Sequence, residues 1–325
     1  MTDNSNRNIH YLRISVTDRC NLRCTYCMPE SGTQYIRHQE ILSYEEILHL
    51  AGLFARLGID RVRLTGGEPL VRKDIDVLVS GLKKIPGIRW VGITTNGVLL
   101  TEQLPALWHA GLDAVNISLD TLDEKEFHAI TRRNLLSKAL EGLRAAQKIP
   151  GLQVRVNCVP LLQNKDQWTA MAALAKNSPG IDVRFIELMP IGLGSNLTCQ
   201  YEEDVLTTLE KTYGPAVPEA TDFECGPSRY VRFRGFAGRV GFISALSHQF
   251  CSNCNRVRLM ATGELKPCLQ YNSDVNLKLL LRSGADDDTI LWTMKETIYH
   301  KPVSHHFRKA STLFDEEHNM NQIGG

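Results

Sequence analysis

The sequence predicts an α/β fold: an incomplete (β/α)6 TIM-like barrel, followed by a C-terminal α+β extension. Short β-type runs alternate with helical patterns six times before residue 190, and the alternation then stops. Strands joined by helices form parallel βαβ units with right-handed crossovers. Six units fall short of the eight of a closed barrel. We therefore expect an open barrel over residues 8–190 and the extension over 191–325.

Each expected element follows from its local pattern. The β-type runs that predict strands lie at 11–16, 61–65, 89–95, 114–120, 153–159 and 182–188. The helical patterns that separate them lie at 44–57, after residue 74, and at 102–110, 124–130, 135–148 and 167–176.

The region after residue 190 has a different order. A Gly-rich loop leads to a helix near 202–212 and then to a Pro-rich link. A β-type pair follows at 229–235 and 238–244, with its turn at 236–238. Helical runs at 275–281 and 287–299 precede a polar tail that ends in two glycines.

The composition is that of an ordinary globular protein, with 325 residues, 43% hydrophobic residues and a net charge of +1. Such a charge gives no overall attraction to nucleic acid or to an anionic membrane. The polar start resembles no signal peptide, and no apolar run reaches the length of a membrane span. We expect a cytoplasmic protein, monomer or homodimer, without nucleic-acid or membrane partners.

The run CNLRCTYC follows the first expected strand. Its Cys20, Cys24 and Cys27 have the spacing C-x3-C-x2-C, which supplies three thiolates and no fourth. A structural zinc site uses four protein ligands, and a cubane iron–sulfur cluster has four irons, usually ligated by four cysteines. Three cysteines therefore leave one iron open to a ligand other than protein.

A second group, Cys251, Cys254 and Cys268, has the spacing C-x2-C-x13-C. The spacing leaves two interpretations open, an iron–sulfur cluster or a zinc site completed by a histidine of the tail. The candidates for that fourth ligand are His300, His305 and His306. We otherwise expect these histidines to be solvated.

Three further cysteines stand alone in the chain. Because the cytosol keeps thiols reduced, disulfides are not expected, and small buried thiols are the simplest interpretation. These residues are Cys158, Cys199 and Cys225.

The Gly66-Gly67-Glu68-Pro69 motif follows the second expected strand, at the edge where α/β proteins bind ligands. Two glycines allow the backbone to approach a ligand closely, and Glu68 could pair with an ammonium group. A tight turn explains the glycines equally well. The sequence has no G-x-x-x-x-G-K-[ST] motif and therefore no P-loop.

Arginines recur inside the expected strands, where an unpaired charge is costly to bury. One such arginine is explained by a salt bridge or a solvated face. Several on the inner strands of one barrel favour a polyanionic ligand, because guanidinium groups bind phosphate oxygens bidentately. The set comprises Arg13, Arg61, Arg63, Arg155, Arg184, Arg256 and Arg258.

Several segments together resemble a known family. The C-x3-C-x2-C run and the GGEP motif resemble the signatures of radical S-adenosylmethionine enzymes. The segments LRISVTDRCNLRCTYCMP, RLTGGEPLVRKD, ITTNG, NISLD, RFIELMPIG, FCSNCNRVRLMATGELKPCL and the terminal GG resemble the MoaA family of GTP 3',8-cyclases of molybdenum cofactor biosynthesis. They run from about residue 11 to the last residue.

The resemblance implies two 4Fe–4S clusters, held by Cys20, Cys24 and Cys27 and by Cys251, Cys254 and Cys268. Residues implied to contact S-adenosylmethionine are Tyr26, Gly67, Ser118 and Met189. Those implied to bind GTP are Arg13, Arg63, Thr94, Arg155, Arg256, Val257 and Arg258, with Arg61 and Arg184 as helpers. The catalytic set would be Arg256, Arg258, Gly324 and Gly325. The family usually has lysine where this chain has Arg155, which keeps the charge but changes the hydrogen-bond geometry.

The resemblance also implies the reaction. An electron from an external reductant cleaves S-adenosylmethionine, and the 5'-deoxyadenosyl radical removes the ribose C3' hydrogen of GTP. C3' then bonds to guanine C8, and the 3',8-cyclo-7,8-dihydro-GTP passes to the enzyme MoaC. Two other functions stay open: a peptide-modifying radical enzyme with an auxiliary cluster, and a zinc-binding module without catalytic activity.

Overall fold

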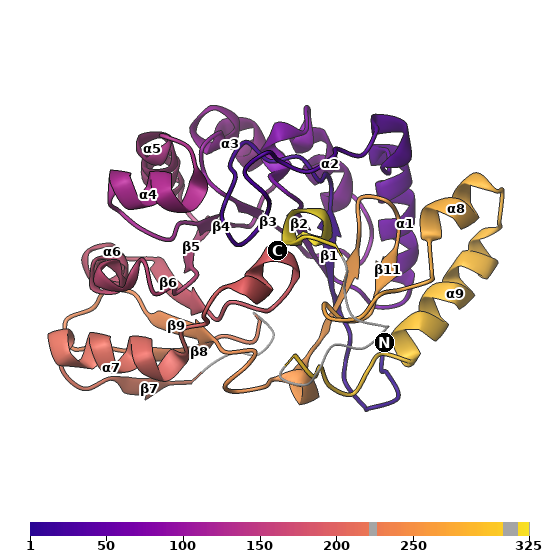
Figure 1. Ribbon diagram of the computed structural model, residues 1–325. Coiled ribbons are helices and arrows are strands. Elements are labelled where there is room, and N and C mark those ends of the chain that lie inside the picture. Colours follow the sequence, from indigo (N-terminus) through magenta and orange to yellow (C-terminus); the bar gives the residue numbers. More distant parts are fainter. Residues whose placement is uncertain (221–225, 308–317, 325) are drawn as a thin grey trace.

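The computed structural model describes residues 1–220, 226–307 and 318–324. Its first half confirms the predicted α/β barrel of six parallel strands with helices on the outside (Figure 1). The strands are β1 (Tyr11–Ser15), β2 (Arg61–Thr65), β3 (Trp90–Thr95), β4 (Ala114–Ser118), β5 (Gln153–Cys158) and β6 (Ile181–Ile186). The helices are α1 (Tyr44–Arg56), α2 (Ile75–Lys83), α3 (Leu100–His109), α4 (Glu124–Thr131), α5 (Leu136–Gln147) and α6 (Trp168–Asn177).

The C-terminal half supplies further strands and helices. The antiparallel pair predicted at 229–244 is confirmed as β8 (Arg229–Arg232) and β9 (Val240–Ile243). The other elements are α7 (Glu202–Tyr213), β7 (Val217–Glu219), β10 (Arg256–Leu259), β11 (Leu265–Lys266), α8 (Leu277–Arg282), α9 (Asp287–Tyr299) and α10 (Met320–Ile323).

These C-terminal strands extend the barrel sheet. In the described residues the strand order is β11-β10-β1-β2-β3-β4-β5-β6-β9-β8-β7, with β10 parallel to β1 and β9 parallel to β6. The outer strands β11, β8 and β7 pair antiparallel. Both edges of the six-stranded barrel are thus covered, which satisfies backbone groups that would otherwise be buried without partners.

The strands alternate between two faces. Leu12 and Ile14 of β1, with Val62 and Leu64 of β2, are fully buried in the hydrophobic core under the helices. The residues between them face the inside of the barrel, because side chains alternate along a strand. This alternation places arginines inside the barrel and apolar residues outside it.

No helix in the described part of the chain is both long and apolar enough to span a membrane.

Candidate active site

The loops that leave the carboxyl ends of the strands carry the polar residues of the site. The cysteine run follows β1, the glycine motif follows β2, and Asn96 follows β3. Asp120 follows β4 and Met189 follows β6. Because parallel strands end at one edge, residues that lie far apart in the sequence meet there. One cavity is lined by residues from all five loops.

Cys20, Cys24 and Cys27 line this cavity, and each is half-buried. The loop is held in a tight turn in which Cys27 N–H donates to Cys24 O at 2.9 Å. Leu22 N–H donates to the Cys20 thiol at 3.4 Å. The Cys27 thiol accepts from the backbone N–H of Asn321, in the C-terminal helix.

The first triad ionises with difficulty in the absence of a metal. Burial, with the charge of Glu68, raises the pKa of Cys20 to about 11, and burial with the charge of Cys20 raises the pKa of Cys27 to about 12. Burial, with the charges of Cys27 and Asp120, raises the pKa of Cys24 well above its usual value. Bound iron stabilises thiolates, so three half-buried thiols that repel one another as anions fit a 4Fe–4S cluster.

Tyr26 joins the cysteine loop to the end of β4. Its hydroxyl donates to Asp120 Oδ2 at 2.7 Å, and Asp120 Oδ1 accepts from Val159 N–H at 2.8 Å. Burial raises the pKa of Asp120 to about 6, although both hydrogen bonds favour the carboxylate. The sequence assigned no role to Asp120, because a single aspartate at a strand end carries no distinguishing signal.

The glycine motif packs directly on the chain that leads to Cys20. A Cβ added to Gly67 would lie 2.6 Å from the carbonyl oxygen of Asp18 and closer still to that of Arg19. The turn therefore requires glycine for packing, and Gly67 also lines the cavity.

Glu68 is almost fully buried at the edge of the cavity. Its carboxylate accepts from Leu70 N–H at 3.0 Å, from the Thr95 hydroxyl at 2.7 Å and from Asn96 N–H at 2.7 Å. Burial nevertheless raises the pKa of Glu68 to about 7. The residue can therefore carry a negative charge near neutral pH in a site that is open to a cationic ligand.

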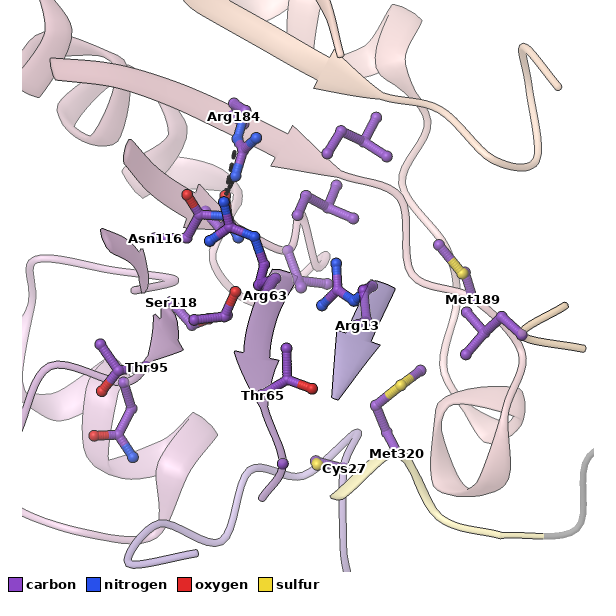
Figure 2. Close-up of a pocket in the computed structure, with 18 of the residues that line it drawn as sticks. Arg13, Cys27, Arg63, Thr65, Thr95, Asn116, Ser118, Arg184, Met189 and Met320 are labelled. Atoms are coloured by element: carbon purple, nitrogen blue, oxygen red, sulfur yellow. Dashed lines mark hydrogen bonds between the residues drawn. The ribbon is translucent and has the colours of Figure 1, made fainter. Parts of the chain in front are cut away.

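Three arginines lie at one level across neighbouring strands. Arg13 on β1 is in register with Arg63 on β2 and with Arg258 on β10. All three line the cavity, as do Arg184 on β6 and Arg256 on β10. In Figure 2 the side chains of Arg184 and Arg63 lie toward one end of the cavity and Cys27 lies at the other, with Arg13 between them.

Two of the cavity arginines, Arg63 and Arg184, are held by neutral groups. Arg63 donates to the Tyr11 hydroxyl at 2.6 Å and to Ile93 O at 3.0 Å. Arg184 donates twice to Asn157 Oδ1, at 2.6 and 3.0 Å. With its amide oxygen turned toward them, Asn116 accepts from Arg63 at 3.0 Å and from Arg184 at 2.8 Å.

Three of the cavity arginines carry charges that no described acidic side chain balances. Within the described residues, Arg63, Arg184 and Arg258 form no ion pair with a carboxylate. Burial, with repulsion from neighbouring arginines, lowers the pKa of Arg184 and of Arg258 to about 10. A polyanionic ligand would relieve this repulsion.

Some of the other predicted contact residues line the cavity and some do not. Thr94, Ser118 and Met189 line it, and the Thr94 hydroxyl has no hydrogen-bond partner in the described part of the chain. Arg155 and Val257 are buried but absent from the lining.

Two of the predicted GTP contacts, Arg155 and Val257, therefore lie behind the residues that line the cavity. Arg155 precedes Asn157 by two residues on the same face of β5, and its charge acts on Arg63 and Arg184. The Val257 side chain packs in the hydrophobic core, so any part in ligand binding falls to its main chain. Arg61, a predicted helper, lies over the Trp90 ring and also does not line the cavity.

The second triad lies beside the same cavity. Cys251 begins the short helix η6 (Cys251–Asn253), Cys254 follows it, and Cys268 follows β11; all three are half-buried. The charges of Cys254 and Cys268 both act on Cys251. Burial raises the pKa of Cys254, but the charges of Lys301 and Arg256 outweigh it and lower the value to about 7.

The tail histidines differ from the prediction. His300 is exposed, as expected, but His305 is buried, with an exposed fraction of 9%. The expectation that it is solvated is wrong, because the chain after α9 folds back and the His305 N–H donates to the Cys251 thiol. Of the solitary cysteines, Cys158 is buried and Cys199 half-buried, whereas Cys225 lies outside the described residues.

Over residues 1–220, 226–307 and 318–324, no three His, Cys, Asp or Glu side chains converge as ligands of one metal ion. Each cysteine of a cubane site binds a different iron atom, so the thiols of such a site need not converge on one point.

The C-terminal helix α10 enters the barrel beside the first triad, where Figure 1 places the C-terminal end over the strand ends. The Asn321 amide donates to Asp18 O at 3.0 Å, and Gly324 O accepts from Arg258 Nη1 at 2.6 Å. Gly324 has φ +82°, and a Cβ there would lie 3.1 Å from Ser15 Cβ and closer to the Thr65 hydroxyl. Gly325 lies outside the described residues.

The fold and the first triad define a class of protein. Residues 14–175 match the family model described as "Radical SAM superfamily", and residues 181–307 match "Molybdenum Cofactor Synthesis C". Two solved structures of Streptococcus suis SuiB share the fold at 16% identity. One has a TM-score of 0.62 over 91% of this chain and 67% of that chain. The other, bound to S-adenosylmethionine, has 0.57 over 81% and 60%.

The family within this class follows from closer relatives. The chain is 44% identical to a GTP 3',8-cyclase of Pelotomaculum thermopropionicum over the full length of both chains. It is 45% identical to one of Thermodesulfovibrio yellowstonii, over 96% of this chain and 99% of the relative. It is also 43% identical to molybdenum cofactor biosynthesis protein 1 of Bos taurus, over 94% of this chain and 48% of that protein. The chain belongs to the GTP 3',8-cyclase family.

Proposed function

We propose that this chain converts GTP to (8S)-3',8-cyclo-7,8-dihydroguanosine 5'-triphosphate, the first step of molybdenum cofactor biosynthesis. One observation carries the proposal: a single cavity is lined by the first cysteine triad and by a group of arginines, of which Arg63, Arg184 and Arg258 form no ion pair within the described residues. A nucleoside triphosphate held by the arginines places its sugar between them and the first triad.

Residues around the first triad bind the cofactors. Cys20, Cys24 and Cys27 would hold a 4Fe–4S cluster, and Tyr26, Gly67, Ser118 and Met189, which line the same cavity, would contact S-adenosylmethionine. When bound, the cluster supplies the electron that cleaves S-adenosylmethionine, and the resulting 5'-deoxyadenosyl radical takes the ribose C3' hydrogen. The chain's contribution is to orient both molecules and exclude water.

The arginines of the same cavity bind GTP. Arg13, Arg63 and Arg258 form the row that faces the triphosphate, while Arg184 and Arg155 add charge from the far wall. The Thr94 hydroxyl, which lacks a partner in the described residues, can donate to the nucleotide. With the nucleotide held at several points, C3' stays close to C8, where the new bond forms.

The second triad completes the site. Cys251, Cys254 and Cys268 would hold a second 4Fe–4S cluster next to the guanine of GTP, because the neighbouring Asn255 and Leu269 line the cavity. An external one-electron reductant supplies the electrons, and the product passes to MoaC. We place the protein in the cytoplasm as a monomer or homodimer. Residues 8–190 form the radical S-adenosylmethionine partial barrel, and residues 191–325 form a C-terminal domain with the second cluster, further substrate contacts and the terminal glycines.

The test is an anaerobic incubation of cluster-loaded protein with S-adenosylmethionine and a reductant, with GTP, with ATP and without nucleotide. We expect 5'-deoxyadenosine and a cyclised nucleotide with GTP only. Equal cleavage in all three mixtures would overturn the proposal. Iron and sulfide analysis separates the alternatives: two clusters give about eight irons with equal sulfide, whereas a zinc module gives zinc without sulfide.

A further inference from the structure

The N-terminal segment and the chain after α9 meet beside the second triad. Arg7 is buried, and its Nε pairs with Asp3 Oδ2 at 2.6 Å. Its Nη1 donates to Cys251 O and to Val303 O, each at 3.0 Å. Its Nη2 donates to Lys301 O at 3.0 Å and to the oxygen of residue 302 at 2.8 Å. One guanidinium thus joins the main chain of Cys251 to residues 301–303, here called the 301–303 strap.

The strap places Lys301 among the other two cysteines of the triad. Its side chain is buried, with 3% of the residue exposed, and Nζ donates to Arg256 O at 2.9 Å and to Pro267 O. It also hydrogen-bonds the Cys254 thiol. An ammonium group has three N–H donors, and these three partners use them all. Lys301 therefore fastens the segment after Cys254 to the segment before Cys268.

The charge of Lys301 is balanced by no acidic side chain among the described residues. In the part of the chain that the structure describes, Lys301 forms no ion pair with Asp or Glu. A lysine is rarely buried in this way unless an anionic group compensates the loss of hydration. The groups on which its charge acts are Cys251 and Cys254, which are anionic as metal ligands. The position of Lys301 thus complements a negatively charged group on the second triad.

We propose that Lys301 positions the second cysteine triad and raises the reduction potential of the iron–sulfur cluster that the triad holds. The proposal rests on the second cluster of the proposed function. A cation beside a cluster favours the reduced form, which carries one more negative charge, and hydrogen bonds to the ligand sulfur act in the same direction. Lys301 is thus a positioning residue that acts on the cluster through its ligands.

The test uses the full chain with Cys20, Cys24 and Cys27 all replaced by Ala, so that the second triad is the only cluster site. In this background, Lys301→Met removes the charge and keeps an unbranched side chain of similar length. We expect iron to fall from about four atoms per chain, or the retained cluster to become harder to reduce. At a fixed potential the ratio of reduced to oxidised cluster should fall about tenfold. For a one-electron couple, this corresponds to a reduction potential that is lower by about 59 mV. Iron and sulfide analysis and a redox titration followed by EPR measure both quantities.

Two controls make the result specific. Lys278→Met removes another buried lysine that donates to a main-chain carbonyl, Glu40 O, and should leave iron and potential unchanged. Lys301→Arg keeps the charge and should restore the potential of the Met variant toward that of the background protein. Where Lys301→Met does not fold, as judged by circular dichroism, Lys301→Gln is measured in its place with the same expectation.

The outcomes separate this proposal from the proposed function. If the background protein binds no iron while the native chain binds about four atoms, the second cluster itself is absent. If the background protein binds about four and the neutral variants keep both the iron and the potential, the role of Lys301 is refuted.

Discussion

Glu68 illustrates how a single residue acquires its properties from the loops around it. Three donors from the two neighbouring loops hold its carboxylate in place, yet burial raises its pKa to about 7. Because the pKa of this acid is raised, Glu68 is neutral at lower pH and gains its charge as the pH rises through about 7. A cationic ligand in the cavity therefore meets an anion only above that pH.

The first prediction concerns the pH dependence of cofactor binding. If Glu68 pairs with the ammonium group of S-adenosylmethionine, affinity should fall about tenfold between pH 8 and pH 6, as the ionised fraction falls. In Glu68→Gln, binding should be weaker at pH 8 and should depend less on pH. Calorimetric titration of cluster-loaded protein without reductant measures this difference. An identical pH profile for both proteins would show that Glu68 does not bind the cofactor.

The second prediction concerns the nucleotide. Arg256→Ala should weaken GTP binding about tenfold or more, because a hydrogen bond to a charged group is lost. Binding of S-adenosylmethionine should persist, since the first triad is intact. Arg282→Ala, an exposed arginine paired with Glu46, is the matched control and should leave both properties unchanged. If Arg256→Ala leaves GTP affinity intact, the nucleotide lies elsewhere in the cavity.

At the scale of elements, strand β10 and helix α10 from the C-terminal half complete the cavity that the six βα units form only in part. The strand β10 pairs with β1 and brings Arg258 level with Arg13, and α10 brings Asn321 to Cys27. The central strands and most helices were predictable, because hydrophobic periodicity and strand–helix alternation are local signals. The parallel pairing of β10 with β1 depends on contacts across the whole chain, which no local pattern reveals.

In the site, too, the sequence revealed the local features but not the contacts between distant segments. Cysteine spacing and strand arginines identified both ends of the cavity, since each signal lies within a few residues. Asp120 and Lys301 had no such signal, because their importance comes from partners more than 30 residues away. The burial of His305 was missed for the same reason, since the segment appears polar and terminal in the sequence.

The third prediction concerns the glycine motif. Gly67→Ala should lower the free energy of unfolding by about 1–3 kcal/mol, because the new methyl group overlaps the carbonyl oxygens of Asp18 and Arg19. The displaced loop should also weaken binding of S-adenosylmethionine. Gly52→Ala is the control: it lies in α1 with open space around it, so it should stabilise the chain by about 0.5–1 kcal/mol. Denaturant unfolding of both variants measures the difference, and equal stability would contradict the close packing.

The fourth prediction concerns the tail, which we infer completes the pocket. Removing Gly324 and Gly325 takes away the carbonyl that accepts from Arg258 and should slow cyclisation strongly. Binding of S-adenosylmethionine should change little, because α10 through Ile323 remains. Turnover of GTP and cofactor affinity are measured on the same preparation. Unchanged cyclase turnover would show that the two glycines do not complete the pocket.

At the scale of the whole molecule, the sheet brings the first cysteine triad into one cavity and the second triad beside it. The barrel half supplies the first triad and most of the cavity arginines, while the C-terminal half supplies the second triad, Arg256 and Arg258. Because β10 and β9 extend the same sheet on both sides, the two halves form a continuous wall around the cavity. Under the proposed function, a radical generated at the first triad would meet a nucleotide bound by the arginines of the same cavity.

The transfer of the ribose hydrogen tests this account most directly. GTP deuterated at C3' is incubated anaerobically with cluster-loaded protein, S-adenosylmethionine and reductant, and the 5'-deoxyadenosine is analysed by mass spectrometry. The account predicts one deuterium in 5'-deoxyadenosine for each cyclised nucleotide, and none when the label is at another ribose carbon. Cyclised product accompanied by unlabelled 5'-deoxyadenosine would contradict it.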